Sequence, residues 1–114
     1  MNSAQDRRRA YQQDLLTTLQ NELGQLEITT VLIVDANGQP CLEVVDRHFR
    51  TRRVYLQTAF HWFYWGDRPD ERSSSLRVEN AARVISTAAQ EGWREGEQET
   101  LSVDLSKIAD AYRM

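Results

Sequence analysis

A hairpin signature over residues 28–45 constrains the fold of this chain more than any other feature. Residues 28–34 are rich in β-branched side chains, whose restricted rotamers suit a pleated sheet. An Asn-Gly dipeptide at 37–38, typical of tight reversals between strands, precedes a second strand-like run at 41–45. Pro40 lacks an N–H for a strand ladder, so it marks the start of the second strand or an edge position. The pattern predicts an antiparallel β-sheet.

The stretch that follows extends this sheet. Residues 46–53 are polar and are expected to form a loop, and residues 54–59 return to a strand-like composition. β-prone residues continue through 62–65, without a Gly, Asn or Asp to force a reversal before Gly66. Either one long strand covers 54–65, or the chain breaks near 59–61 into a tight hairpin, and we favour the break. Residues 67–75 have the composition of an exposed loop.

Helical periodicity appears on both sides of the predicted sheet. Residues 4–23 carry apolar side chains at spacings of three and four, and Gly24 stands where the pattern stops. An alanine-rich pattern runs over 78–89 and ends before Gly92, and a third pattern covers 101–112. We therefore predict an α+β fold with an N-terminal helix, a three- to four-stranded antiparallel meander sheet, and two C-terminal helices packed on the sheet.

Length and composition suit one domain in the cytoplasm. The 114 residues are 40% hydrophobic and 27% charged, as in ordinary globular domains. We expect a single domain over 1–114, with residues 1–5 as a flexible tail and 91–100 as an acidic linker to the last helix. No apolar run is long enough to span a membrane or to act as a secretory signal. Lys107 is the one lysine among many arginines, which suggests a GC-rich, bacterial genome.

The sequence contains no recognisable catalytic or metal-binding motif. A metal site needs converging ligands, and Cys41, His48 and His61 are scattered singly. The serines at 73–75 lack the context of an activated nucleophile, and no glycine-rich phosphate loop occurs. We therefore expect a non-enzymatic protein without a metal ion or cofactor. One alternative stays open, a small-ligand pocket or enzyme site around His61 with Tyr55 and aromatic residues in its wall.

Four consecutive aromatic residues form the leading candidate for a binding surface. Because side chains alternate along a strand, Trp62 and Tyr64 belong to one sheet face, and Phe63 and Trp65 belong to the other. The strand is either central, with both faces covered, or it presents two large aromatic side chains to a partner. Our leading hypothesis is a protein–protein interaction or regulatory module that acts as a homodimer through these residues. The acidic residues 91–99 would then steer a basic partner.

An arginine cluster between the second and third strands supports a nucleic-acid alternative. Four arginines fall within seven residues, and the ring of Phe49 among them is suited to stacking on a base. The cluster consists of Arg47, Arg50, Arg52 and Arg53. A net charge of −3 argues against a nucleic-acid-binding domain. A hairpin tip kept soluble by arginine is the competing explanation.

Overall fold

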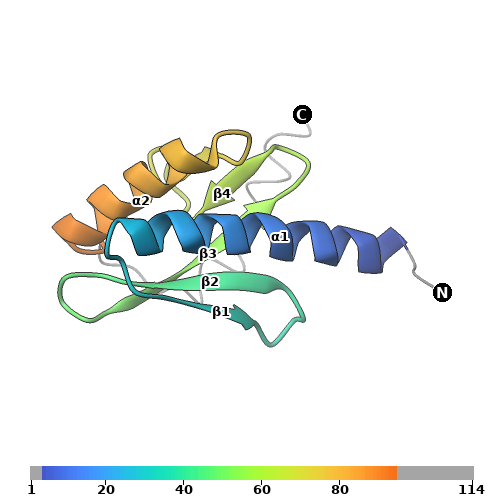
Figure 1. Cartoon of the computed structure of the whole chain (residues 1–114), viewed down its shortest axis with the longest axis horizontal. Helices are drawn as coiled ribbons and strands as arrows, with labels where there is room; N and C mark the ends of the chain where they lie inside the picture. The colour runs from blue at the N-terminus through green and yellow to red at the C-terminus, as the bar shows by residue number, and fades with distance from the viewer. Residues whose placement is uncertain (1–3, 95–114) are drawn as a thin grey trace.

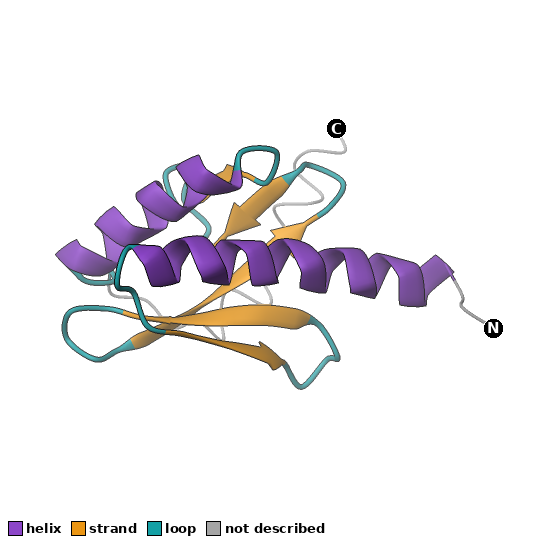
Figure 2. Cartoon of the chain, in the orientation of Figure 1, coloured by secondary structure: helices purple, strands orange, loops and turns teal. Residues whose placement is uncertain are grey.

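Two helices lie on one face of a five-stranded antiparallel sheet in the computed structural model, which describes residues 4–94 (Figure 1 and Figure 2). The elements are α1 (Ala4–Gln25), β1 (Thr30–Val34), β2 (Pro40–Val45), β3 (Thr51–Gln57), β4 (Trp62–Tyr64), β5 (Arg72–Ser74) and α2 (Val78–Glu91). Strands that are neighbours in sequence are neighbours in the sheet. The predicted α+β class and the meander are therefore confirmed.

The sheet has two halves that share one strand. Residues 51–54 of β3 pair with residues 42–45 of β2. Residues 55–57 of β3 pair instead with residues 62–64 of β4. Within the described chain, β3 is therefore the only strand that joins the β1–β2 hairpin to the β4–β5 hairpin.

The favoured break between the third and fourth strands is confirmed. β3 ends at Gln57, and a turn in which His61 donates its N–H to the carbonyl of Thr58 leads into β4. His61 has a φ of +54°, a left-handed conformation typical of tight turns. β3 begins at Thr51 rather than at the predicted residue 54, because residues 51–54 form its ladder with β2.

Other parts of the prediction need correction. The sheet has five strands rather than three or four, because residues 72–74, predicted as loop, pair with β4 as β5. An Arg-Ser-Ser segment has little strand propensity, so its pairing is imposed by the neighbouring strand. Residues 4–94 contain two of the three predicted helices, α1 and α2. The helix predicted over 101–112 and most of the acidic linker at 91–100 lie outside the described residues.

The end of α1 also differs from the prediction. The helix continues to Gln25, and Glu27, not Gly24, takes the left-handed conformation after it, with φ +64°. The Leu23 carbonyl accepts the N–H groups of Leu26 and Ile28, each at 3.0 Å, which closes the last turn.

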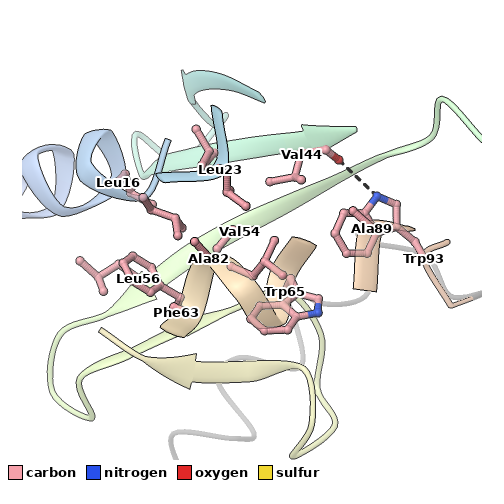
Figure 3. Close-up of a cluster of buried hydrophobic side chains, with 14 residues drawn as sticks. Leu16, Leu23, Val44, Val54, Leu56, Phe63, Trp65, Ala82, Ala89 and Trp93 are labelled. Atoms are coloured by element: carbon pink, nitrogen blue, oxygen red, sulfur yellow. Dashed lines mark hydrogen bonds between the residues drawn. The ribbon is translucent and has the colours of Figure 1, made fainter. Parts of the chain in front are cut away.

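The core fills the space between the helices and the sheet face that they cover (Figure 3). α2 presents small side chains to this core, which lets the helix approach the sheet closely. Trp93, just after α2, closes one end of the core and donates its indole N–H to the Val44 carbonyl at 3.2 Å. The buried cluster consists of Leu16, Leu19, Leu23, Leu42, Val44, Val54, Leu56, Phe63, Trp65, Ala81, Ala82, Ile85, Ala89 and Trp93.

Candidate functional site

Two turns of the sheet share one hydrogen-bond pattern, and the first is the predicted Asn-Gly hairpin. Asp35 donates its backbone N–H to the Gln39 carbonyl at 2.9 Å. Its Oδ1 accepts the N–H groups of Asn37 and Gln39, each at 2.9 Å. Gly38, three residues after the aspartate, donates to the Asp35 carbonyl and has φ +80°. Glycine suits this position because it has no Cβ to clash in the left-handed region.

The second turn, between β2 and β3, repeats the pattern with a different residue at the strained position. Asp46 donates its N–H to the Arg50 carbonyl, and its Oδ1 accepts the N–H groups of His48 and Arg50, each at 2.8 Å. Phe49 donates to the Asp46 carbonyl and has φ +63°. A large aromatic residue thus occupies the position that is glycine in the first turn.

The Phe49 ring buries little of its surface against the rest of the described chain. It is 89% exposed, the highest exposure among the large hydrophobic side chains of the described residues. A non-glycine residue in the left-handed region costs roughly 1 kcal/mol or more. The backbone strain therefore has no compensating burial in the described chain, and such a combination indicates a functional role for the ring.

The Asp46 carboxylate that holds this turn is buried, and both of its oxygens accept hydrogen bonds. The Asp46 side chain has no exposed surface, and its Oδ2 accepts the Trp93 N–H at 2.9 Å and the Arg50 Nε–H at 3.3 Å. Burial acts to raise the Asp46 pKa, but hydrogen bonds from the Trp93, Arg50 and His48 N–H groups outweigh it and lower this pKa to about 2. Asp46 is therefore ionised at neutral pH and stabilises the turn as a charged acceptor.

Contacts from the end of α2 fix the same turn from a second side. Arg47 donates its backbone N–H to the Ala89 carbonyl at 3.0 Å. The Trp93 indole N–H also reaches the Arg50 carbonyl at 3.2 Å, and the Arg50 Nη2 donates to the Trp93 carbonyl at 2.7 Å. The turn that presents Phe49 is therefore rigidly attached to the body of the fold.

A small cavity adjoins the exposed ring. It has a volume of about 190 Å³ and is lined by residues from the α1–β1 loop, the end of β2, the β2–β3 turn and the end of α2, Phe49 among them. Its apolar wall includes Ile28, Val45 and Ala89. An exposed aromatic ring beside a shallow apolar hollow is the type of surface that a protein partner covers. We refer to Phe49 and this cavity as the Phe49 tip.

The structure separates the arginine cluster into different roles. Arg52 is buried, with Nη1 at 3.1 Å from the Glu71 carboxylate and its guanidinium carbon 5.9 Å from the centre of the Trp93 ring. Arg53 lies on the sheet face away from the helices, 3.6 Å from Glu43. Arg50 is bound to Asp46 as described above. Arg47 is exposed beside Phe49. The four charges thus do not form one basic surface.

The aromatic run is mainly part of the interior. Phe63 and Trp65 are 0% and 2% exposed in the core, and Tyr64 is 8% exposed on the opposite face, where its ring stacks on Tyr55 at 5.8 Å. Trp62 is half-buried, with the Arg72 guanidinium carbon 4.3 Å from its ring centre. A partner could reach Trp62 among these four residues, but not the buried three without rearrangement.

His61 is exposed in the β3–β4 turn and does not line the cavity beside Phe49. Within residues 4–94, no group of three or more His, Cys, Asp or Glu side chains could hold a metal ion. None of the helices in this part of the chain has the length and apolarity needed to cross a bilayer.

Comparison with known proteins gives no match: no family model, no curated protein and no solved structure is similar enough to this chain to be reported. The functional interpretation therefore depends on the physical features of the chain itself.

Sequence reasoning missed the residues that organise the Phe49 tip. The sequence pattern places Asp46 only in a polar loop and does not indicate that Trp93 belongs to the core. A signal for the turn did exist, because Asp35 and Asp46 each open a reversal between two strand-like runs. Trp93 gave no local signal, since its partners lie more than forty residues earlier in the chain.

Proposed function

We propose that this protein is a non-enzymatic interaction module that binds another protein through the Phe49 tip. The observation that carries the proposal is the exposed Phe49 ring in a left-handed backbone conformation, at a position where the equivalent turn has Gly38. A rigid aromatic side chain is an effective anchor because it buries a large area and loses little conformational entropy on binding.

The expected partner surface is an apolar pocket of ring size with acidic groups at its rim. Phe49 would fill the pocket, and the exposed Arg47 next to it would meet the acidic rim. The turn needs no reorganisation to bind, because Asp46, Ala89 and Trp93 already hold it in place.

A protein partner is favoured over nucleic acid. Phe49 and Arg47 are equally suited to stacking and phosphate contact, but Arg50, Arg52 and Arg53 each have a carboxylate within 4 Å. These ion pairs reduce the positive potential on which nucleic-acid affinity depends. Self-association through Trp62 and Tyr64 has less support than the Phe49 tip, because Tyr64 is almost fully buried.

The experiment is a pull-down from lysate of the host cell with three versions of the tagged full chain. They are wild type, Phe49→Gly and Leu76→Ala. Phe49→Gly removes the ring and keeps the backbone conformation, and Leu76→Ala removes an apolar side chain that is 71% exposed before α2. We expect a nuclease-resistant protein that wild type and Leu76→Ala retain equally and that Phe49→Gly loses. Equal capture by all three versions would refute the proposal.

Two further measurements separate the alternatives. Analytical ultracentrifugation of wild type and Phe49→Gly shows whether the partner is a second copy of this chain. A complex that dissociates with nuclease, or that weakens steeply with salt when Arg47 is replaced by Gln, would favour nucleic acid over protein.

A further inference from the structure

A second cavity lies at the other end of the sheet from the β2–β3 turn. It has a volume of about 450 Å³, which falls in the usual range for small-ligand sites. Its lining comes from α1, the β1–β2 turn, the end of β3 with the residue that follows it, and Tyr64 of β4. Because the strands are antiparallel, the β1–β2 turn and the end of β3 share one end of the sheet, while the β2–β3 turn occupies the other.

The strand pairing explains why a cavity forms there. β2 pairs with β3 only as far as Leu42 opposite Val54, so residues 55–57 of β3 pair with β4 alone. The start of β2 and the end of β3 therefore diverge from each other. The first half of α1 projects across this gap (Figure 1), and Arg8, Arg9 and Gln12 of the helix line the cavity.

The charges in the cavity favour an anion. Arg8 and Arg9 contribute two positive charges, and among the ion pairs of residues 4–94 neither guanidinium has a carboxylate within 4 Å. Asp35 is the one carboxylate in the lining, so the charged side chains of the lining carry one net positive charge.

The Asp35 carboxylate is already occupied by internal donors. Its Oδ1 accepts two turn N–H groups, and its Oδ2 accepts the Tyr55 hydroxyl at 3.0 Å. Burial raises the Tyr55 pKa to about 12, so this hydroxyl keeps its proton and remains a donor to Asp35. Asp35 is thus a structural acceptor, and the two arginines remain for a ligand.

The rest of the lining is suited to hydroxyl groups. The side-chain amides of Gln12, Asn37 and Gln39 each offer a donor and an acceptor, as does the Thr58 hydroxyl. The Gln57 oxygen already accepts the Ala59 N–H at 3.2 Å, so Gln57 contributes mainly its NH₂ donor. A nucleobase would require an accessible ring face for stacking. The Tyr55 and Tyr64 rings stack on each other and are only 5% and 8% exposed, so they offer none.

We propose that this cavity binds a small phosphorylated polyol, such as a sugar phosphate. The Arg8 and Arg9 guanidinium groups would hold the phosphate, and the amides of Gln12, Asn37 and Gln39 would bind the hydroxyl groups. This site is independent of the Phe49 tip, so either function can fail without the other.

The test is a calorimetric titration of the full chain with glucose 6-phosphate, with glucose and inorganic phosphate as separate arms. We expect saturable binding of glucose 6-phosphate, at least about tenfold tighter than either component alone, because only this probe uses the arginines and the amides together. Equal affinity for inorganic phosphate would overturn the polyol part of the proposal. Absence of saturable binding up to millimolar concentrations would overturn it entirely.

Matched variants decide whether the binding is at this site. The double variant Arg8→Gln/Arg9→Gln should lose at least about tenfold in affinity, and Gln12→Glu should weaken binding to a similar extent by adding a negative charge. Arg7→Gln is the control, because Arg7 lies on the same helix but not in the lining. Similar losses in the control and the double variant would show nonspecific attraction and would refute the site.

Discussion

Gly38 and Phe49 occupy the same position in two turns of identical hydrogen-bond pattern, three residues after an aspartate whose Oδ1 caps the turn. Both residues have positive φ, +80° and +63°. Only the glycine is suited to that conformation, so the comparison isolates the backbone strain that Phe49 carries.

Replacing Phe49 with glycine should preserve or raise stability. The ring is 89% exposed, so little packing is lost, and relief of the left-handed strain should increase the free energy of unfolding by up to about 1 kcal/mol after the added chain entropy is subtracted. Urea denaturation followed by circular dichroism measures this change. Gly38→Ala is the reciprocal variant and should destabilise by about 1 kcal/mol, since its Cβ has space but its φ is unfavourable. A loss of more than about 1 kcal/mol in Phe49→Gly would show that the ring is structural.

Acid should weaken the β2–β3 turn in a defined pH window. The Asp46 pKa is lowered from 3.8 to about 2 in the folded protein. The stabilisation is therefore complete above about pH 4 and is lost as the pH falls through about 2, with a total of roughly 2 kcal/mol. Asp46→Asn should remove this part of the pH dependence and destabilise by a similar amount at neutral pH. Urea midpoints from pH 7 to pH 2 test both statements, and an unchanged profile in Asp46→Asn would contradict them.

The buried ion pair between Arg52 and Glu71 should matter far more than the exposed pair between Arg94 and Asp70. The Arg52 and Glu71 side chains are 10% and 9% exposed, so Glu71→Gln leaves a buried guanidinium without its counter-charge and should cost about 3 kcal/mol. The Arg94 and Asp70 side chains are 48% and 59% exposed, so solvent screens this pair and Asp70→Asn should have a far smaller effect than Glu71→Gln. Equal effects in thermal or urea denaturation would refute this ranking.

Cys41 should react slowly with thiol reagents in the native protein. The thiol is fully buried beside Tyr55 and Tyr64, and burial raises its pKa, although the nearby Arg53 acts in the opposite direction. Less thiolate and no access both reduce the rate. We expect alkylation by iodoacetamide at pH 8 to be limited by opening of the fold and to become fast in denaturant. Equally fast labelling in both conditions would contradict the buried position.

The sequence predicted the fold where local chemistry determines it. The β1–β2 hairpin is confirmed because Asn-Gly and the flanking β-branched residues act within a few positions of each other. β5 was missed because an Arg-Ser-Ser segment forms a strand only when β4 is beside it.

The site was harder to predict because it depends on distant contacts. The arginine cluster looked uniform in sequence, but Glu71 and Trp93 draw Arg52 inward while Arg47 stays exposed. Likewise, the run at 62–65 looked like a binding surface, and only the packing of both sheet faces shows that three of its residues are buried. The sequence shows Phe49 as an aromatic residue among arginines, but its strain appears only in the backbone angles.

The dependence of the Asp46 turn on Trp93 has a consequence for the order of events during synthesis. The Asp46 carboxylate accepts a hydrogen bond from the Trp93 backbone N–H, and Trp93 is translated 47 positions after Asp46. A nascent chain whose residue 93 has not yet emerged from the ribosome lacks this contact to the turn, even when β2 and β3 are already outside. Among residues 4–94, the clamp on this turn is therefore one of the last contacts that can form during synthesis.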